Sequence, residues 1–197
     1  MEWRSGRART EYGDKHIKKN QELVIVPEYA PMAKQLQDAL RYNEAIFEEF
    51  MPYKIMPPII NRYNTDSPFF GRHGDSALVG DGQVRSDVSC TIFLTSPENY
   101  EGGELIIKDK YSVKGPAGTA FVYDGGQPHW VTPVTRGERV SAVTWMQSYI
   151  RSPQRRQLMS ELTQVLKNLE KQREDWDAEY TSLGLVKSNL LRMWMET

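Results

Sequence analysis

The chain has 197 residues, which is the length of one domain that can bury a core of its own. Its 25 lysines and arginines are balanced by 26 aspartates and glutamates, so there is no global basic field to hold nucleic acid, and a nucleic-acid partner is not expected. The one cysteine, Cys90, cannot form an intrachain disulfide, and no run of about 18 apolar residues marks a membrane span. The composition therefore predicts a cytoplasmic protein that does not enter a membrane.

The first part of the chain predicts a charged arm followed by helices. Residues 2–20 carry many charges and few apolar side chains, so this stretch is expected to be a loose arm, with His16 as a surface residue. Beyond Glu28 the apolar residues follow helical spacing, which predicts two short helices that end before Pro52. The residues that set this pattern are Met32, Leu36, Ala39, Leu40, Ile46, Phe47 and Phe50.

Short strands are predicted through the middle of the chain. The segments with the alternation or apolar content of strands are 59–63, 86–95, 104–108, 119–123 and 139–148. Glycine and proline groups such as Gly102-Gly103 separate them. Many short strands with regular punctuation are typical of a β-sandwich or jelly roll. The alternation within 86–95 places Cys90 among core residues, which is the usual position of a free cysteine.

The last part of the chain predicts a pair of helices. Ser152-Pro153 is a typical helix start, and two apolar stripes follow at helical spacing. The first stripe is Leu158, Leu162, Val165, Leu166 and Leu169, and the second is Leu183, Val186, Leu190, Leu191 and Trp194. The start of the second helix is left open because Gly184 disfavours a helix interior.

These elements predict one domain over residues 1–150 and a helical extension over 151–197 that packs on it. Arg155 and Arg156 are expected to be solvated or to cap the surface of the extension. The apolar stripes permit a second interpretation, in which the two helices form a surface for a homodimer or another partner.

Two histidines and one aspartate form the group of residues that specifies chemistry. His73 and Asp75 are two residues apart on an extended segment, so their side chains project to the same side. His129 follows a Gly-Gly turn and precedes apolar residues, which places it at the mouth of a strand. Two imidazoles and a carboxylate on one side of a metal leave positions open for O2 and a co-substrate, an arrangement that suits Fe(II). Zinc accepts the same ligands, so both metals remain open from the residues alone.

Arg139 is predicted to lie close to the third of these residues. It opens a strand after a tight turn that contains Arg136, so the two segments form a hairpin that brings Arg139 near His129. Both faces of this strand are largely apolar, and a buried arginine needs a paired anion. An internal glutamate such as Glu104 is one candidate, and a bound dicarboxylic acid, held by the planar guanidinium, is the other. Arg136 is the rival arginine, but its turn position favours a solvated charge.

Other polar residues are predicted to belong to the same acid-binding site. Ser141 and Trp145 share one face of the strand with Arg139, because strand side chains alternate. Tyr63 lies on the predicted strand upstream of His73, where its hydroxyl can donate to a bound carboxylate. An ordinary core tyrosine with a satisfied hydroxyl is the alternative for Tyr63.

Several longer runs of sequence resemble one known family. The chain resembles the PKHD-type hydroxylases, a bacterial and phage branch of the Fe(II)- and 2-oxoglutarate-dependent dioxygenases related to prolyl hydroxylases. The matching runs are Asn61-Arg62-Tyr63, His73-x-Asp75, 86–94, 99–105, His129-x-Val131 through Gly137-x-Arg139, Trp145-x-Gln147-Ser148, and short motifs near both ends. The chain begins later than the family pattern, since relatives usually carry a further strand and helix before the segment that matches Trp3 to Arg7.

The resemblance implies a fold, a cofactor set and a reaction. It implies that His73, Asp75 and His129 bind Fe(II), and that Arg139 pairs with the distal carboxylate of 2-oxoglutarate. The implied fold is mainly β with flanking helices (α+β): a double-stranded β-helix, or jelly roll, with N-terminal helices and a C-terminal helical pair. The implied reaction consumes O2 and 2-oxoglutarate, releases succinate and CO2, and hydroxylates a C–H bond, with ascorbate as a candidate reductant.

Two questions remain open in the sequence. The substrate is a peptidyl residue such as proline, an amino acid or a small molecule, because the fold does not fix what enters the pocket. A catalytically inactive β-helix module that binds a metal or a small organic acid is the alternative function. The segment 76–85, with Gly80 and Gly82, is predicted to be a lid that faces the substrate, and an ordinary flexible connection is the alternative.

Overall fold

The computed structural model describes residues 2–9, 17–24, 26–172 and 177–196. His16 lies outside these residues. The seven helical elements are η1 (Gly6–Arg9), η2 (Pro27–Tyr29), α1 (Ala30–Arg41), α2 (Glu44–Phe50), η3 (Pro97–Asn99), α3 (Pro153–Gln172) and α4 (Ala178–Trp194). The strands of the first half are β1 (Trp3–Ser5), β2 (Lys18–Lys19), β3 (Gln21–Leu23), β4 (Pro52–Ile55), β5 (Ile59–Tyr63), β6 (Phe69–His73), β7 (Leu78–Val79), β8 (Val84–Arg85) and β9 (Val88–Phe93). Those of the second half are β10 (Tyr100–Gly102), β11 (Leu105–Ile107), β12 (Tyr111–Val113), β13 (Ala120–Asp124), β14 (His129–Val131), β15 (Val134–Gly137) and β16 (Arg139–Ser148).

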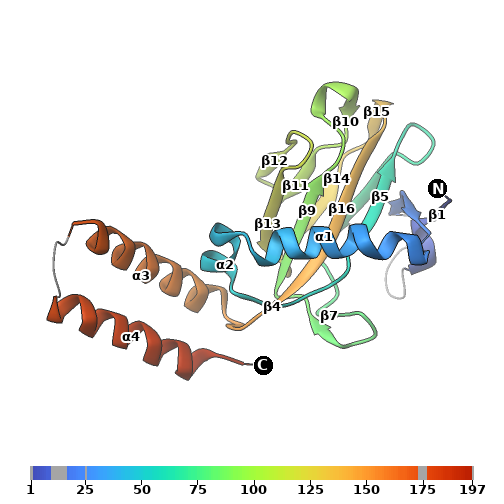
Figure 1. Cartoon of the computed structure of the whole chain (residues 1–197). Helices are drawn as coiled ribbons and strands as arrows, with labels where there is room; N and C mark the ends of the chain where they lie inside the picture. Colours follow the sequence, from blue (N-terminus) through green and yellow to red (C-terminus); the bar gives the residue numbers. More distant parts are fainter. Residues whose placement is uncertain (1, 10–16, 25, 173–176, 197) are drawn as a thin grey trace.

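Two antiparallel sheets form the body of the molecule (Figure 1). The larger sheet has seven strands in the order β1-β3-β5-β16-β9-β13, with β4 also paired to β16. The smaller sheet has five strands in the order β12-β11-β14-β6-β2. Both sheets contribute side chains to one apolar cluster, namely Tyr63, Tyr100, Leu105, Ile107, Tyr123, Val131 and Val134. The inner faces of the two sheets therefore enclose a common core, as in a sandwich or jelly roll.

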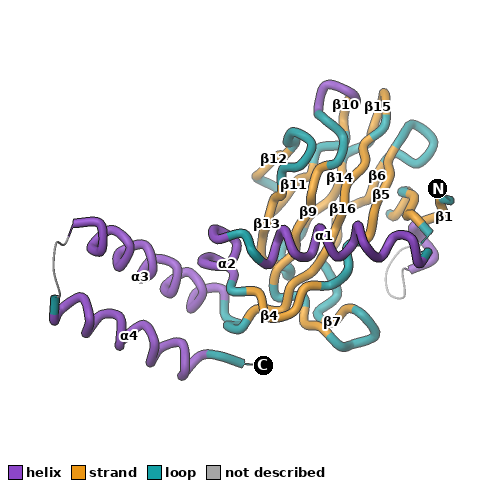
Figure 2. The backbone as a smooth tube through the Cα atoms, viewed as in Figure 1, coloured by secondary structure: helices purple, strands orange, loops and turns teal. Residues whose placement is uncertain are grey.

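The N-terminal helices cover the outer face of the larger sheet (Figure 2). Ala33 and Leu40 of α1 are buried against a cluster that includes Ile60, Cys90 and Ala142 of the sheet. All six residues of β9 are buried, because this strand has the helices on one side and the second sheet on the other. Burial raises the pKa of the Cys90 thiol to about 12, in agreement with its predicted place in the core.

The predicted helices form, and Leu36, Leu40, Ile46 and Phe50 pack in or against the core as expected, but other residues assigned to their apolar faces do not. Met32 and Phe47, which were expected on the apolar faces, are 42% and 50% exposed. The second C-terminal helix begins at Ala178, where the Asp177 carboxylate accepts hydrogen bonds from two backbone N–H groups of the first turn. Gly184 therefore lies inside α4 and does not mark its start.

The start of the chain and the segment after Asp75 are also more regular than predicted. Within the expected arm, β1 pairs with β3 at the edge of the larger sheet. The predicted lid contains a small hairpin, in which β7 pairs with β8. Its turn has positive φ at Gly80 (60°) and Gly82 (80°), a conformation that glycine adopts at no steric cost.

The C-terminal hairpin, α3 and α4, extends away from the sheets (Figure 2). At its base, Ile150 and Met159 pack with Met51 and with partly buried residues of α4 that include Trp194. Along its length, Lys167 of α3 forms ion pairs with two glutamates of α2. No residue of α4 is fully buried.

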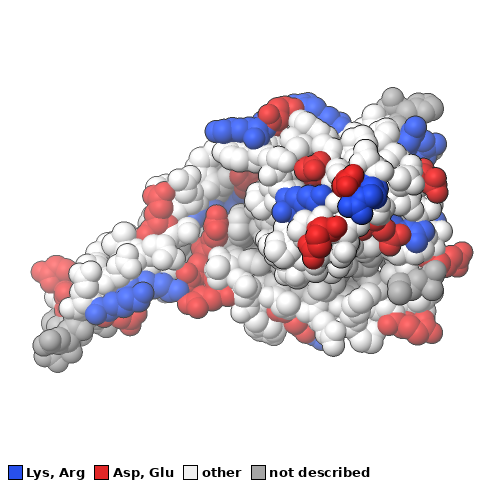
Figure 3. Space-filling model, turned by 90° about the horizontal axis from the view of Figure 1, so that it is seen from above, with Lys and Arg blue, Asp and Glu red and all other residues white. Residues whose placement is uncertain are grey.

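The surface carries charges of both signs. Figure 3 shows lysine, arginine and acidic side chains interspersed on the face that it displays, as the near-equal totals predict. In the described part of the chain, no helix combines the length and the apolar character needed to cross a membrane.

Candidate metal centre and acid pocket

The pairing of β6 with β14 brings the two predicted histidines together. His129 is the register partner of His73, and the centroids of their rings are 4.3 Å apart. Asp75 follows the end of β6, and its Oδ1 lies 3.8 Å from Nε2 of His129. One ligand atom from each of the three residues lies within 4.8 Å of the others. Residues 56 positions apart in the chain thus meet because two short strands are neighbours in one sheet.

Hydrogen bonds orient all three side chains toward the same point. Nδ1 of His73 lies 2.8 Å from the carbonyl oxygen of Gly71, and Nδ1 of His129 lies 2.9 Å from that of Gln127. Since a carbonyl only accepts, each Nδ1 carries the proton and donates it, which leaves the Nε2 lone pair free for a metal. The Ser89 hydroxyl donates to Oδ2 of Asp75 at 2.5 Å and leaves Oδ1 for the cluster.

The electrostatics of the cluster also suit a metal ligand set. Burial, and then the neighbouring imidazole of His129, lower the pKa of His73 to about 4. The imidazole is therefore neutral at neutral pH, the form in which histidine binds metals. The Phe70 ring stacks on His73 with the centroids 3.6 Å apart and limits access of water from that side. Two imidazoles and one carboxylate fit Fe(II), and the donor set alone also permits zinc.

Arg139 lies in the core at the start of β16. Its side chain is almost fully buried, and its guanidinium carbon lies 5.1 Å from the ring centroid of Tyr63, its register partner on β5. Nη1 donates to the Ser141 hydroxyl at 2.8 Å. Nε and Nη2 make no hydrogen bond of good geometry with the described residues, although the Tyr100 hydroxyl lies close enough to the guanidinium to act against the lowering of its pKa. Burial lowers the pKa of Arg139 from its ordinary value, so the site favours an anion that compensates the charge.

The internal partner considered for Arg139 is not found. Among the described residues no ion pair of Arg139 is found, and its charge contributes only the smallest of the effects that lower the pKa of Glu104. The Glu104 carboxylate instead accepts a hydrogen bond from the Thr132 hydroxyl, which is the main reason why the pKa of Glu104 is lowered. Arg136 is 61% exposed and pairs with Glu101, as expected for a solvated turn residue. The two free donor groups of Arg139 therefore fit a bound organic acid better than any side chain nearby.

Tyr100 is a member of this pocket that the sequence did not single out. It is 1% exposed, its hydroxyl lacks a partner among the described side chains and backbone, and it lies next to Arg139. Gly103 has a φ of 67°, and a Cβ there would come within 3.0 Å of Cδ of Arg139 and 3.1 Å of the Tyr100 ring. The glycine is thus required for the chain to pass beside both residues. The Gly102-Gly103 pair was the available signal, but it was interpreted only as a break between strands.

The remaining predicted residues occupy separate parts of the site. Tyr63 is 3% exposed, and burial raises the pKa of its hydroxyl to about 12. Ser141 contacts Arg139 directly, as described above. Trp145 lies six residues further along β16, opposite Ser89, and its buried Nε1–H has no partner in the described structure. Trp145 therefore adjoins the metal-ligand end and not the guanidinium.

Comparisons with known proteins agree with this geometry. The model of the 2OG-Fe(II) oxygenase superfamily matches residues 58–147. The fold resembles a prolyl hydroxylase from Trichoplax adhaerens (TM-score 0.53, 15% identity, 74% of this chain and 70% of that one). It also resembles a viral collagen prolyl hydroxylase from Paramecium bursaria Chlorella virus-1 (TM-score 0.51, 17% identity, 66% of this chain and 80% of that one). The predicted jelly-roll core with flanking helices is therefore confirmed, and the chain is an oxidoreductase of the 2OG-Fe(II) oxygenase class.

Closer relatives identify the branch. A PKHD-type hydroxylase of Variovorax paradoxus is 38% identical over 202 residues, which cover 98% of this chain and 89% of that protein. A PKHD-type hydroxylase of Burkholderia ambifaria is 39% identical over 205 residues, covering 99% and 88%. The chain belongs to the PKHD-type hydroxylases, as the resemblance indicated, and this family implies Fe(II) and 2-oxoglutarate as its cofactor and co-substrate.

Proposed function

We propose that this hydroxylase couples the oxidation of 2-oxoglutarate to succinate and CO2 with hydroxylation of a C–H bond, at the site formed by His73, Asp75 and His129. The observation that carries the proposal is the combination of this cluster with a buried arginine that has two unpartnered N–H groups. Iron bound there would supply the activation of O2 that this chemistry requires.

The residues of the chain have distinct roles in this proposal. His73, Asp75 and His129 would hold the metal, and Ser89 fixes the rotamer of the aspartate. Arg139 receives the distal carboxylate of 2-oxoglutarate on Nε and Nη2, because a guanidinium edge matches a carboxylate with two parallel hydrogen bonds. The Ser141 hydroxyl accepts a hydrogen bond from Nη1, the remaining nitrogen of the guanidinium.

Aromatic residues complete the proposed pocket. The Tyr63 ring packs on the guanidinium and excludes water from it. The hydroxyl of Tyr100 is a further donor for the distal carboxylate, and the Trp145 indole supplies a donor near the metal-ligand end. A dry pocket strengthens each of these hydrogen bonds, because the local dielectric constant is low.

The substrate belongs to one of three classes: a peptidyl residue such as proline, a free amino acid or a small molecule. Location in the cytoplasm, for which a single cysteine argues, is part of the same proposal. Ascorbate is proposed only as a reductant that keeps the metal in the Fe(II) state.

Uncoupled turnover tests the reaction. Purified full-length protein, given Fe(II), 2-oxoglutarate, ascorbate and O2 without any substrate, is expected to release succinate slowly, and addition of a true substrate should increase the rate. Succinate is measured by proton NMR, with an anaerobic sample as the control. Tight binding of 2-oxoglutarate without turnover, in protein shown to contain iron, would favour the inactive module instead.

We also infer that the C-terminal hairpin joins two copies of the chain. Leu158, Val165 and Leu169 of α3 are 54%, 48% and 37% exposed, and Val186 and Met193 of α4 are 50% and 74% exposed. The spacing of seven and four residues aligns each set along one side of its helix. A pair of antiparallel helices that presents both stripes on the same side would be half of a four-helix bundle, which a second copy completes by two-fold symmetry.

The mass in solution tests this inference. Light scattering is expected to give twice the chain mass of 22.7 kDa. Val165→Glu should shift the protein toward the monomer, because it places a charge in the apolar interface, whereas Asn168→Glu, an exposed position outside the stripe, should not. A wild-type monomer at all accessible concentrations would contradict the dimer.

A further inference from the structure

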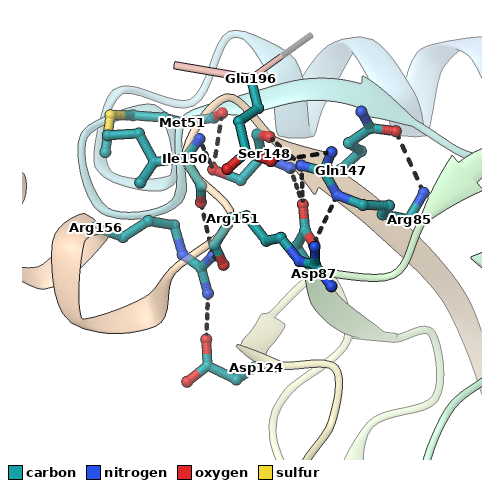
Figure 4. A network of polar contacts seen from close by, with 10 residues as sticks. All are labelled: Met51, Arg85, Asp87, Asp124, Gln147, Ser148, Ile150, Arg151, Arg156 and Glu196. Carbon is teal, nitrogen blue, oxygen red and sulfur yellow. Dashed lines mark hydrogen bonds and ion pairs between the residues drawn. The ribbon is translucent and has the colours of Figure 1, made fainter. Parts of the chain in front are cut away.

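Arg156 of α3 is a buried arginine that reaches out of the C-terminal hairpin. The sequence predicted a residue that is solvated or caps the helix surface, but its side chain is 3% exposed and the structure shows three polar contacts (Figure 4). Nη2 pairs with Oδ1 of Asp124 at 2.5 Å. Nη1 donates to the carbonyl oxygens of Ile150 and Arg151 at 2.9 and 2.8 Å. The prediction of a surface residue was therefore wrong for Arg156, because its partner comes from a strand 32 residues earlier in the chain.

The partner of Arg156 begins the turn that leads to the metal cluster. Asp124 is the last residue of β13, and its backbone oxygen accepts from the N–H of Gln127 at 3.1 Å. The backbone oxygen of Gln127 in turn accepts from Nδ1 of His129 at 2.9 Å. A short series of contacts thus runs from a helix outside the sheets to the atom that sets the tautomer of a proposed metal ligand.

The same turn packs closely against residues 86–89, the segment whose Ser89 hydroxyl donates to Asp75. The N–H of Gly125 donates to the backbone oxygen of Asp87 at 3.1 Å. A Cβ at Gly125 would lie 2.1 Å from the backbone oxygen of Ser86 and 3.2 Å from Oγ of Ser89, the hydroxyl that donates to Asp75. A displacement of this turn would therefore disturb the supports of two of the three clustered residues.

The end of the chain reinforces this region from a second side. The Asp87 carboxylate accepts from the N–H of Ser148 at 3.0 Å and from Arg85, also at 3.0 Å (Figure 4). Arg85 also lies 3.7 Å from the carboxylate of Glu196, beyond the end of α4. Both ends of the C-terminal hairpin are thus tied to segments that flank the metal cluster.

We propose that Arg156 is a positioning residue: through Asp124 it fixes the turn over residues 124–127, and so sets the orientation of His129 in the metal cluster. This inference rests on the proposed function of that cluster. The C-terminal hairpin then determines how well the barrel binds its metal, in addition to any role in joining subunits.

A purely structural role for Arg156 explains less of the geometry. The hairpin already has other anchors, because Met159 packs in an apolar cluster at its base and Lys167 pairs with α2. Burying the guanidinium of Arg156 costs desolvation energy that an apolar residue of similar size would avoid, and the Asp124 carboxylate that compensates it is still 32% exposed, so the pair is weak support for stability alone. Asp124 begins the turn that precedes His129, so an ion pair at this position can fix that turn in addition to stabilising the fold.

Metal affinity separates the two roles. Full-length wild type, Arg156→Met and Asp124→Asn are titrated with Co(II), whose ligand-field absorption reports both occupancy and geometry of the site. Both variants are expected to bind Co(II) up to about 10-fold more weakly, the lower end of the cost of losing an outer partner of a metal ligand, since the Gln127 carbonyl that holds His129 is displaced and not removed, and to show a changed spectrum. The double variant should be no weaker than either single variant, because both changes break one link.

The matched control is Leu166→Ala, which removes a buried side chain of α3 without touching the link to Asp124. It is expected to lower the melting temperature while leaving the affinity and spectrum of Co(II) as in wild type. If Arg156→Met behaves in the same way, the positioning role is overturned. Should Arg156→Met fail to fold, Asp124→Asn, which keeps the shape of the side chain, decides the question by the same two readouts. Absence of Co(II) binding in wild type would instead overturn the proposed function, and this inference with it.

Discussion

His129→Ala is expected to reduce the release of succinate to the background rate and to weaken metal binding by more than about 100-fold. Loss of an outer partner of a ligand already costs about 10- to 100-fold in affinity or activity, and this change removes one of the three ligand atoms themselves. It also removes the imidazole next to Asp75, whose Oδ1 lies 3.8 Å from Nε2 of His129. Two ligands on one side of an ion do not hold Fe(II) firmly enough for turnover.

The measurement combines succinate release with anaerobic titration by Fe(II) and 2-oxoglutarate, in which the intact site develops a weak visible charge-transfer band. Trp130→Phe is the control, because Trp130 neighbours His129 on β14 but its side chain projects to the opposite face of the strand. It should leave both readouts unchanged. Normal succinate release by His129→Ala would remove this cluster from consideration as the reaction centre.

The three clustered residues were predictable because their chemistry is rare in this chain. His73 and Asp75 form a local pattern, and few other histidines exist to complete it. The contact itself was not predictable from periodicity, since it depends on the register of β6 with β14. The resemblance to a family therefore indicated that His129 joins His73 and Asp75, which local sequence patterns do not show.

Tyr100 shows why other parts of the site were missed. Its position beside Arg139 is set by the pairing of β10 with β15, where Tyr100 is the register partner of Gly137. A Cβ at Gly137 would lie 2.1 Å from the backbone oxygen of Asn99, so this close approach depends on glycine. The sequence shows that a glycine stands at such a position, but it does not show which residue of another strand packs against that glycine.

The helices illustrate a second limit of sequence patterns. Apolar spacing correctly indicated α1 and the burial of Leu40, but Met32, expected on the same face, is exposed, and Ala33, which was not singled out, is buried. The face that a helix buries is decided by the surface on which it packs, and that surface is assembled from distant strands. Arg156 was misjudged for the same reason, since Asp124 lies in another element.

Arg139→Met is expected to weaken binding of 2-oxoglutarate strongly while leaving the protein without 2-oxoglutarate at least as stable as wild type. In the complex, removal of one partner of a buried, hydrogen-bonded charge pair costs about 2 to 5 kcal/mol, or roughly 30-fold to several thousand-fold in Kd. In the free protein, Nε and Nη2 are buried without a partner among the described residues, so an apolar side chain of similar length avoids an existing penalty. The opposite signs of the two effects distinguish a ligand-binding arginine from a structural one.

Calorimetric titration with 2-oxoglutarate in the presence of Mn(II) and melting curves with and without 2-oxoglutarate measure the two effects. Arg139→Lys should lie between wild type and Arg139→Met, since it retains the charge but loses the planar fork. Arg136→Met is the matched control, because Arg136 is exposed, pairs with Glu101 on the surface and should not alter the affinity for 2-oxoglutarate. If Arg139→Met instead destabilised the free protein by several kcal/mol and kept its affinity, Arg139 would be a core residue paired within the chain, and the acid pocket would have to lie elsewhere.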